Sequence, residues 1–215
     1  MKTRERILQA SLQLFNQQGE RQVTTNHIAQ HLGMSPGNLY YHFRNKQQII
    51  AELFALYEAQ VDGYLRVPEG RPLELADKAW YLESIFRGLW DYRFLHRDLE
   101  HLINSDAQLA QRYQQFSRRC VSSGEAIYKG LVEADILCSE RTDPGALAIN
   151  SWLLMTGWVG YLYATVLDSE QAELTPEMLR RGVYQVLVQE RGLLTERVRA
   201  EVEAMLDDYY VPLSP

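Results

Sequence analysis

The segment "TTNHIAQHLGMSPGNLYYHF", residues 24–43, decides the fold of the first part of the chain. Thr24 or Thr25 can begin a short helix, and the "GMS" stretch that follows it predicts a tight turn. Ser35 can cap a second short helix whose first residue is Pro36, a position at which a missing backbone N–H costs nothing. Two short helices joined by a turn that contains glycine are typical of a helix-turn-helix motif.

The second of these helices has one apolar face and one polar face. Leu39 and Phe43 lie four residues apart and can pack inward against the preceding helices. At about 100° per residue, Gly37, Asn38 and Tyr41 fall on the opposite face. In the major groove of DNA, an amide can pair with adenine and an aromatic ring can contact a thymine methyl group. We therefore predict that Asn38 and Tyr41 read bases and that Gly37 lets the backbone approach closely.

Other side chains beside this face can reach the DNA backbone. Tyr40, His42 and Lys46 are predicted to contact phosphates on the two walls of the groove. Thr25 and the free N–H groups at the start of its helix suit another phosphate. The alternative is a plain helical bundle with a solvated surface, in which Tyr40 packs rather than binds.

The charge of the chain is divided unevenly along its length. The 215 residues carry a formal net charge of −6. Residues 1–50 hold six Lys and Arg against two Glu, a net of +4, which leaves −10 for the rest of the chain. A basic segment attached to an acidic body indicates a nucleic-acid task for the basic segment.

The residues from Thr24 to Ile50 closely resemble the DNA-binding segment of the TetR family of bacterial transcription regulators. The match covers about residues 3–50 and is far more specific than a lone helix-turn-helix. The matching residues are Thr24, Thr25, Ile28, Ala29, Gly33, Ser35, Gly37, Leu39, Tyr40, His42, Phe43 and Lys46. Pro36 departs from the pattern, because many members place there a side chain that can reach a base.

This resemblance implies both an assembly and a set of contacts. The implied protein is a homodimer with a helical C-terminal ligand domain, bound to double-stranded operator DNA that an inducer releases. The family positions that face DNA correspond to Thr25, Ser35, Gly37, Asn38, Tyr40, Tyr41, His42 and Lys46.

Helical periodicity continues through the rest of the chain, without strand-like alternation of useful length. We predict an all-α fold with an N-terminal three-helix bundle over residues 1–47 and a larger helical ligand-binding and dimerisation domain over residues 48–215. Thr3 is expected to cap the first helix, Asn45 the fourth and Thr195 the last. A single helix is expected over about residues 73–95, and another over about residues 106–134.

Most of the aromatic residues, 19 of 23, lie after residue 50. The majority must form the core, but buried tyrosine and tryptophan need polar partners, and several together often line a pocket. We predict a pocket for an apolar or amphipathic small molecule. Its candidate lining residues are Trp80, Phe86, Trp90, Tyr113, Phe116, Tyr128, Met155 and Trp158.

The segment over residues 144–167 is apolar nearly all round, so both of its faces must be covered. Gly157 and Gly160 can let a neighbouring helix approach closely. We expect this helix and the next one, from each of two subunits, to form a four-helix dimer interface. The partner stripe on the next helix is Leu179, Val183, Val186 and Leu187, and the alternative stripe on the last helix is Val198, Val202 and Leu206.

Several other classes of protein find no support in the sequence. Apolar runs are too short for a membrane span, and the charged first residues do not resemble a signal peptide, so a cytoplasmic protein is expected. Cys120 and Cys138 match neither a disulfide framework nor a zinc motif. The histidines and carboxylates of "HRDLEH", residues 96–101, are expected on a solvated face rather than at a metal.

Two classes of function remain, and no cofactor is expected for either. The first is a ligand-responsive, dimeric transcription regulator, in its simplest form a repressor. The second is a DNA-bound structural or division-control protein on the same fold that acts through a protein partner. An enzyme is not expected, because neither a nucleophile–base signature nor a nucleotide-binding fingerprint is found.

Overall fold

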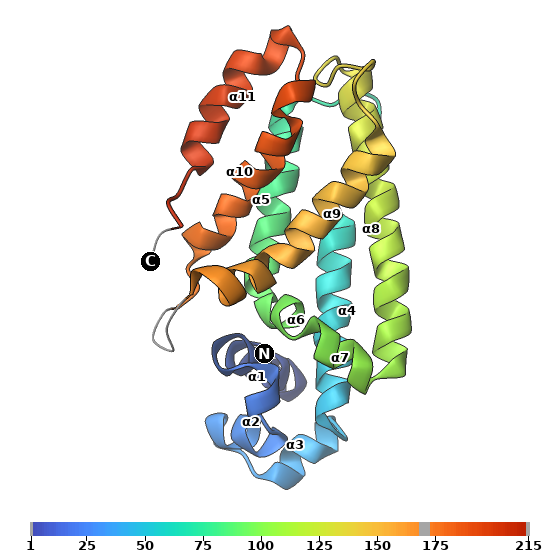
Figure 1. Cartoon of the computed structure of the whole chain (residues 1–215). Coiled ribbons are helices and arrows are strands. Elements are labelled where there is room, and N and C mark those ends of the chain that lie inside the picture. The colour runs from blue at the N-terminus through green and yellow to red at the C-terminus, as the bar shows by residue number, and fades with distance from the viewer. Residues whose placement is uncertain (1, 168–172, 214–215) are drawn as a thin grey trace. The chain divides into compact units, whose positions relative to one another are not determined.

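The computed structural model describes residues 2–167 and 173–213, and over these residues the fold is all-α, as the sequence predicts (Figure 1). The chain forms two compact units. The first contains Met1–Gln60 and Asp91–Gln114, and the second contains Val61–Trp90 and Gln115–Pro215. Two helices, α4 (Lys46–Tyr64) and α8 (Ala107–Glu133), run without interruption from one unit into the other. The predicted DNA-binding segment, residues 1–47, lies within the first unit.

The first unit begins with short helices around an apolar centre. Its elements are α1 (Thr3–Gln18), the 3-10 turn η1 (Glu20–Gln22), α2 (Thr25–His31), α3 (Pro36–His42), most of α4, α6 (Arg93–Arg97), α7 (Leu99–Ser105) and the start of α8. Phe15, Ile28, Leu39 and Phe43 are fully buried and hold the first helices together.

Local capping sets the boundaries of these helices. The Thr24 hydroxyl accepts a hydrogen bond from the His27 N–H at 3.2 Å, and Ser35 caps α3 in the same way. Asn45 accepts from the N–H of Gln48 at 2.8 Å at the start of α4, as predicted. Thr3 does not cap α1, which is a correction to the sequence analysis. Lys2 is the capping residue because its N–H donates to the Glu5 carboxylate at 3.0 Å.

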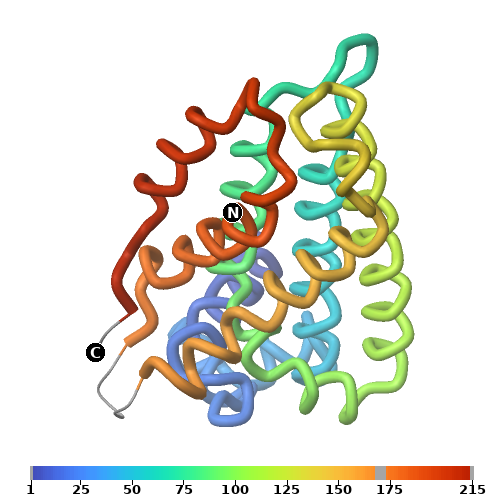
Figure 2. Tube along the Cα trace, turned by 45° about the horizontal axis from the view of Figure 1, so that its top comes forward, coloured from blue at the N-terminus to red at the C-terminus, as the bar shows by residue number. Residues whose placement is uncertain are grey.

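The second unit contains the remaining helices. They are α5 (Leu75–Asp91), the rest of α8, α9 (Pro144–Tyr161), the π-helical η2 (Leu162–Val166), α10 (Pro176–Glu190), η3 (Arg191–Leu193) and α11 (Glu196–Tyr209). Figure 2 shows α10 running beside both α9 and α11, and it packs against each of them. An isolated bridge joins Leu137 to Leu194. Thr195 is the N-cap residue of α11, as predicted, but its hydroxyl donates to the Asp135 carbonyl and makes no capping hydrogen bond to the helix.

The helix expected over residues 73–95 is interrupted near Asp91. The Asn16 side-chain amide donates to the Asp91 carbonyl at 2.7 Å, and its carbonyl oxygen accepts from the Phe94 N–H at 3.1 Å. A side chain from α1 therefore satisfies backbone groups that would otherwise bond within one helix, and α6 begins as a separate element.

The expected dimer stripe on α10 is wrong. Val183, Val186 and Leu187 are fully buried inside the second unit, where α10 packs against its own neighbours. The alternative stripe on α11, Val198, Val202 and Leu206, is also buried. A helical stripe in sequence indicates that one face is covered, but it does not say whether the same chain or a second chain covers it.

Candidate nucleic-acid interface

The helix α3 presents the face that its sequence predicts. Leu39 is fully buried beneath it, whereas Gly37, Asn38 and Tyr40 are exposed. Tyr41 is 85% exposed, which is unusual for a large aromatic side chain. Because α3 is anchored from below by its apolar side, its polar and aromatic groups are held toward solvent.

Two predicted phosphate-contacting residues are brought together by different helices. The hydroxyl of Thr25, in the first turn of α2, lies 3.0 Å from that of Tyr40 on α3. The pair joins the start of α2 to the recognition helix and orders both hydroxyls at one place. One of the two O–H hydrogens lies between the oxygens, so the pair can donate one hydrogen bond to a phosphate from a side chain that is already ordered.

His42 stands at the end of the same helix. Its ring packs edge-on against that of Tyr41, with ring centroids 5.2 Å apart. Its backbone carbonyl accepts from the Arg4 guanidinium at 2.6 Å, and that guanidinium also forms an ion pair with Glu52. The end of α3 is thus held to α1 and α4 by one arginine.

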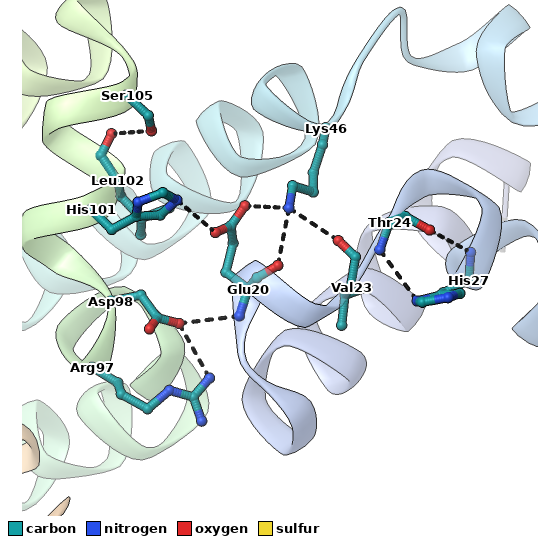
Figure 3. A network of polar contacts seen from close by, with 10 residues as sticks. All are labelled: Glu20, Val23, Thr24, His27, Lys46, Arg97, Asp98, His101, Leu102 and Ser105. Carbon is teal, nitrogen blue, oxygen red and sulfur yellow. Dashed lines mark hydrogen bonds and ion pairs between the residues drawn. The ribbon is translucent and has the colours of Figure 1, made fainter.

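Lys46, unlike the other predicted phosphate-contacting residues, has its charged group bonded to residues of this chain. Its ammonium group is 2.6 Å from the Glu20 carboxylate and donates to the carbonyls of Glu20 and Val23, each at 3.0 Å (Figure 3). An ammonium group has three hydrogens, so these acceptors account for all of them. A phosphate contact by Lys46 stays a prediction, and it requires at least one of these bonds to be exchanged.

A second polar contact, which the sequence analysis missed, joins the 96–101 segment to the end of α1 and to η1. Arg97 donates to the Phe15 carbonyl at 2.8 Å, and the Glu20 N–H donates to the Asp98 carboxylate at 3.1 Å. His101 lies 3.6 Å from the other oxygen of the Glu20 carboxylate (Figure 3). These groups are therefore partners of the helix-turn-helix segment and not a solvated face. Their spacing in sequence could not reveal this, because the partners lie about 80 residues away.

Gly19, at the end of α1, is a residue of the sequence that relates to the contact with Arg97. Its φ of +91° ends α1 in a conformation that other residues rarely adopt. A Cβ atom there would lie 3.2 Å from the Arg97 guanidinium, so the close approach of Arg97 also depends on the missing side chain.

The predicted ligand-lining residues do not all have the same surroundings. Phe86 and Trp90 share a hollow of the second unit, whereas Tyr113 lines a small pocket of the first unit. Trp80 is half exposed and packs edge-on against Tyr64. The other four have partners within the second unit. Phe116 packs against Trp152, and Met155 packs against the core. The Tyr128 hydroxyl is hydrogen-bonded to Ser151 and Glu190, and the Trp158 indole N–H donates to the Met178 carbonyl.

Within the described residues, no group of three or more histidine, cysteine or carboxylate side chains is arranged to hold a metal ion. The same residues contain no helix long and apolar enough to cross a membrane.

Comparison with known proteins identifies the family. Residues 7–53 match the family model of bacterial regulatory proteins of the tetR family, and residues 56–202 match the TetR model described as bacterial transcriptional repressor. The chain belongs to the TetR family. Its members are transcriptional regulators that bind DNA, not enzymes.

The similar proteins and solved structures differ in how much of this chain they cover. A crystal structure of a TetR-family transcriptional regulator from Marinobacter aquaeolei VT8 is 46% identical, with a TM-score of 0.89 over 98% of this chain and all of that one. The transcriptional regulator AcrR of Shigella flexneri is 36% identical over 59 residues, which is 27% of each chain. A SmeT–triclosan complex shares the fold at 20% identity, with a TM-score of 0.60 over 98% of this chain and 95% of that chain.

Proposed function

We propose that this protein is a dimeric, sequence-specific repressor that leaves its operator when a small molecule binds the second unit. The observation that carries the proposal is the face of α3, where the glycine, amide and aromatic groups of Gly37, Asn38 and Tyr41 project into solvent above a buried apolar side. A helix that displays such groups on its solvent face matches the needs of base readout in the major groove.

Phosphate contacts complete the proposed interface. Thr25 and Tyr40 form the paired hydroxyls, Ser35 lies exposed at the start of α3, and His42 lies at the end. The net charge of +4 over residues 1–50 attracts DNA although the whole chain is acidic. Since operator DNA is the partner, we place the protein in the cytoplasm.

A second copy of the chain is proposed to pack on α9. No charged residue occurs from Pro144 to Leu167, yet Ile149, Leu153 and Tyr161 are about half exposed or more. An exposed helix face without charge is typical of a protein–protein interface. On α10, Val188 is a further exposed apolar residue.

The proposed coupling between ligand and DNA uses α4. This single helix begins in the first unit, where Lys46 is bonded to η1, and ends in the second unit at Tyr64. A ligand that displaces its last turn can therefore move the helix-turn-helix segments of a dimer apart. Such coupling is about 1–3 kcal/mol in allosteric proteins, and operator must weaken ligand binding by the same factor. That a related fold is known as a SmeT–triclosan complex supports a small-molecule effector.

The direct test is to select DNA fragments with the purified protein and sequence them. Two identical reading heads in a dimer should select a near-palindromic site with two half-sites. If the selected fragments share no motif, or share only a single half-site, the proposal of a dimeric, sequence-specific repressor is wrong.

The first prediction concerns base readout by Tyr41. Tyr41→Ala should weaken binding to the selected operator by about 1–3 kcal/mol and leave binding to random DNA nearly unchanged. Asn38→Ala should act in the same way. Tyr41→Phe is the matched control, because it keeps the ring for a methyl contact and removes only the hydroxyl. Equal losses on operator and random DNA would contradict a reading role.

The second prediction concerns Lys46. Lys46→Met should lower the free energy of unfolding by about 1–3 kcal/mol, because the buried Glu20 carboxylate and two carbonyls lose their donor. If Lys46 also binds a phosphate, the magnitude of the slope of log K against log salt should fall by about 0.9 in this variant. Urea unfolding and a salt titration on the same variant separate the two effects, and an unchanged salt slope would leave Lys46 with a structural role alone.

A further inference from the structure

The second unit contains a hollow of about 280 Å³ between α5 and the beginning of α10. Glu83, Phe86, Arg87 and Trp90 line it from α5, where their spacing of three and four residues puts them on one face. Pro176 and Arg180 line it from α10. The volume is close to the lower end of the range for small-molecule sites, which suits a molecule of one or two rings.

The aromatic floor of this hollow is held in place by close packing. Phe86 is buried, and a Cβ atom at Gly182 would lie 2.2 Å from its ring, so the ring rests directly on the α10 backbone. The same atom would lie 2.9 Å from Trp158, whose indole N–H donates to the Met178 carbonyl at 3.2 Å. A ligand ring would therefore meet an ordered apolar surface, with Trp90 beside it.

The rim of the hollow carries an excess of positive charge. Arg180 donates to the Glu83 carboxylate at 3.2 Å and lies over the Tyr209 ring, and the Tyr209 hydroxyl donates to the same carboxylate at 2.7 Å. Hydrogen bonds from Tyr209 and then Arg180 hold the pKa of Glu83 below its usual range, so this carboxylate stays ionised and occupied. Two arginines against one carboxylate leave one net positive charge.

Arg87 supplies that unmatched charge. It is exposed and forms neither a hydrogen bond nor an ion pair with the residues that the structure describes, although its charge also helps to lower the pKa of Glu83, four residues earlier on α5. Its guanidinium can accept a carboxylate in a two-point fork, a geometry that a lysine could not offer. This site stands out because the chain after residue 50 has a net charge of −10.

We propose that this hollow binds an aromatic carboxylate of one or two rings, with the ring on Phe86 and Trp90 and the carboxylate on Arg87. The binding of this molecule in the hollow is independent of the proposed function. Its role as the effector of DNA binding rests on the proposed function. The class follows from the combination of an aromatic, apolar floor and a single excess cation.

Calorimetric titration of the full chain with 2-naphthoate tests the site, with 2-naphthamide as the neutral compound of the same shape. The acid should bind and the amide should bind at least 10-fold more weakly. Arg87→Gln should weaken binding of the acid by about 10- to 100-fold, the effect of one charge-assisted hydrogen-bonded pair. Arg118→Gln, a change of another exposed arginine in the same unit, should have no effect.

The ring position is tested with a second pair of variants. Trp90→Leu should weaken binding of 2-naphthoate, whereas Trp80→Leu, at the half-exposed tryptophan outside the hollow, should leave it unchanged. Absence of binding to 2-naphthoate at 1 mM or below (roughly the weakest range for a specific ligand), equal binding of acid and amide, or equal losses in the paired variants would each overturn the proposal.

Measuring operator affinity with and without saturating 2-naphthoate distinguishes this inference from the proposed function. If 2-naphthoate binds through Arg87 but affinity for the selected operator is unchanged at saturation, the site stands and its role as the effector site is wrong. If operator binding is specific but 2-naphthoate does not bind, the repressor proposal stands and the assignment of this hollow is wrong.

Discussion

Glu190→Ala is expected to lower the free energy of unfolding by about 3–5 kcal/mol, enough to remove a large share of the stability of a typical domain. Glu190 is fully buried on α10 and forms an ion pair with Lys78 of α5, which is also buried. The Tyr128 hydroxyl donates to the same carboxylate and contacts Ser151 at 2.6 Å. The variant leaves the Lys78 ammonium in the core without its carboxylate.

The size of the effect comes from an unpaired charge and not from the strength of the pair. Removing both members, as Lys78→Met with Glu190→Leu, should therefore recover much of the lost stability, because two apolar side chains need no polar partner. The exposed pair Arg191–Glu203 is the matched control, and Glu203→Ala should cost about 1 kcal/mol or less.

Urea unfolding of the single, double and control variants measures these differences. A Glu190→Ala variant no less stable than Glu203→Ala would show that Lys78 finds another partner or reaches water. A double variant as unstable as Glu190→Ala would show that the packing around the pair, and not the orphaned charge, accounts for the loss.

Dimer disruption should have the largest effect on DNA binding. Ile149→Glu with Leu153→Glu should separate the proposed dimer and reduce affinity for a two-half-site operator by about 100- to 10,000-fold, because the second head then no longer binds intramolecularly. Ile149 is 50% and Leu153 62% exposed, so neither change disturbs the core of a single chain. Sedimentation and operator titration on the same samples measure both effects.

Two controls make this experiment specific. Val67→Glu places a charge at another exposed apolar residue, in the loop between α4 and α5, and should leave the dimer intact. Val183→Glu should unfold the second unit instead of dissociating a folded dimer, because Val183 is fully buried within it. A dimer that survives the double change on α9 would place the interface elsewhere.

The sequence by itself determined the all-α class and the boundaries of the helix-turn-helix. It could do so because caps and helical periodicity are local, and Thr24, Ser35, Pro36 and Asn45 act on backbone groups within three or four residues of themselves. The burial of Leu39 and the exposure of Tyr41 follow from the same periodicity. The family also follows from this segment, because the residues that carry the resemblance lie close together.

Contacts between distant segments decided the rest. Asn16 ends α5 and starts α6 through backbone groups about 75 residues away, so periodicity alone predicted one unbroken helix. The Glu20 carboxylate forms an ion pair with Lys46, which the sequence analysis assigned to a phosphate. The apolar stripe of α10, which the sequence analysis assigned to a second subunit, is buried where α10 packs against α9 and α11. A sequence pattern shows which groups need a partner, but only the folded chain shows which of the available partners lies within reach.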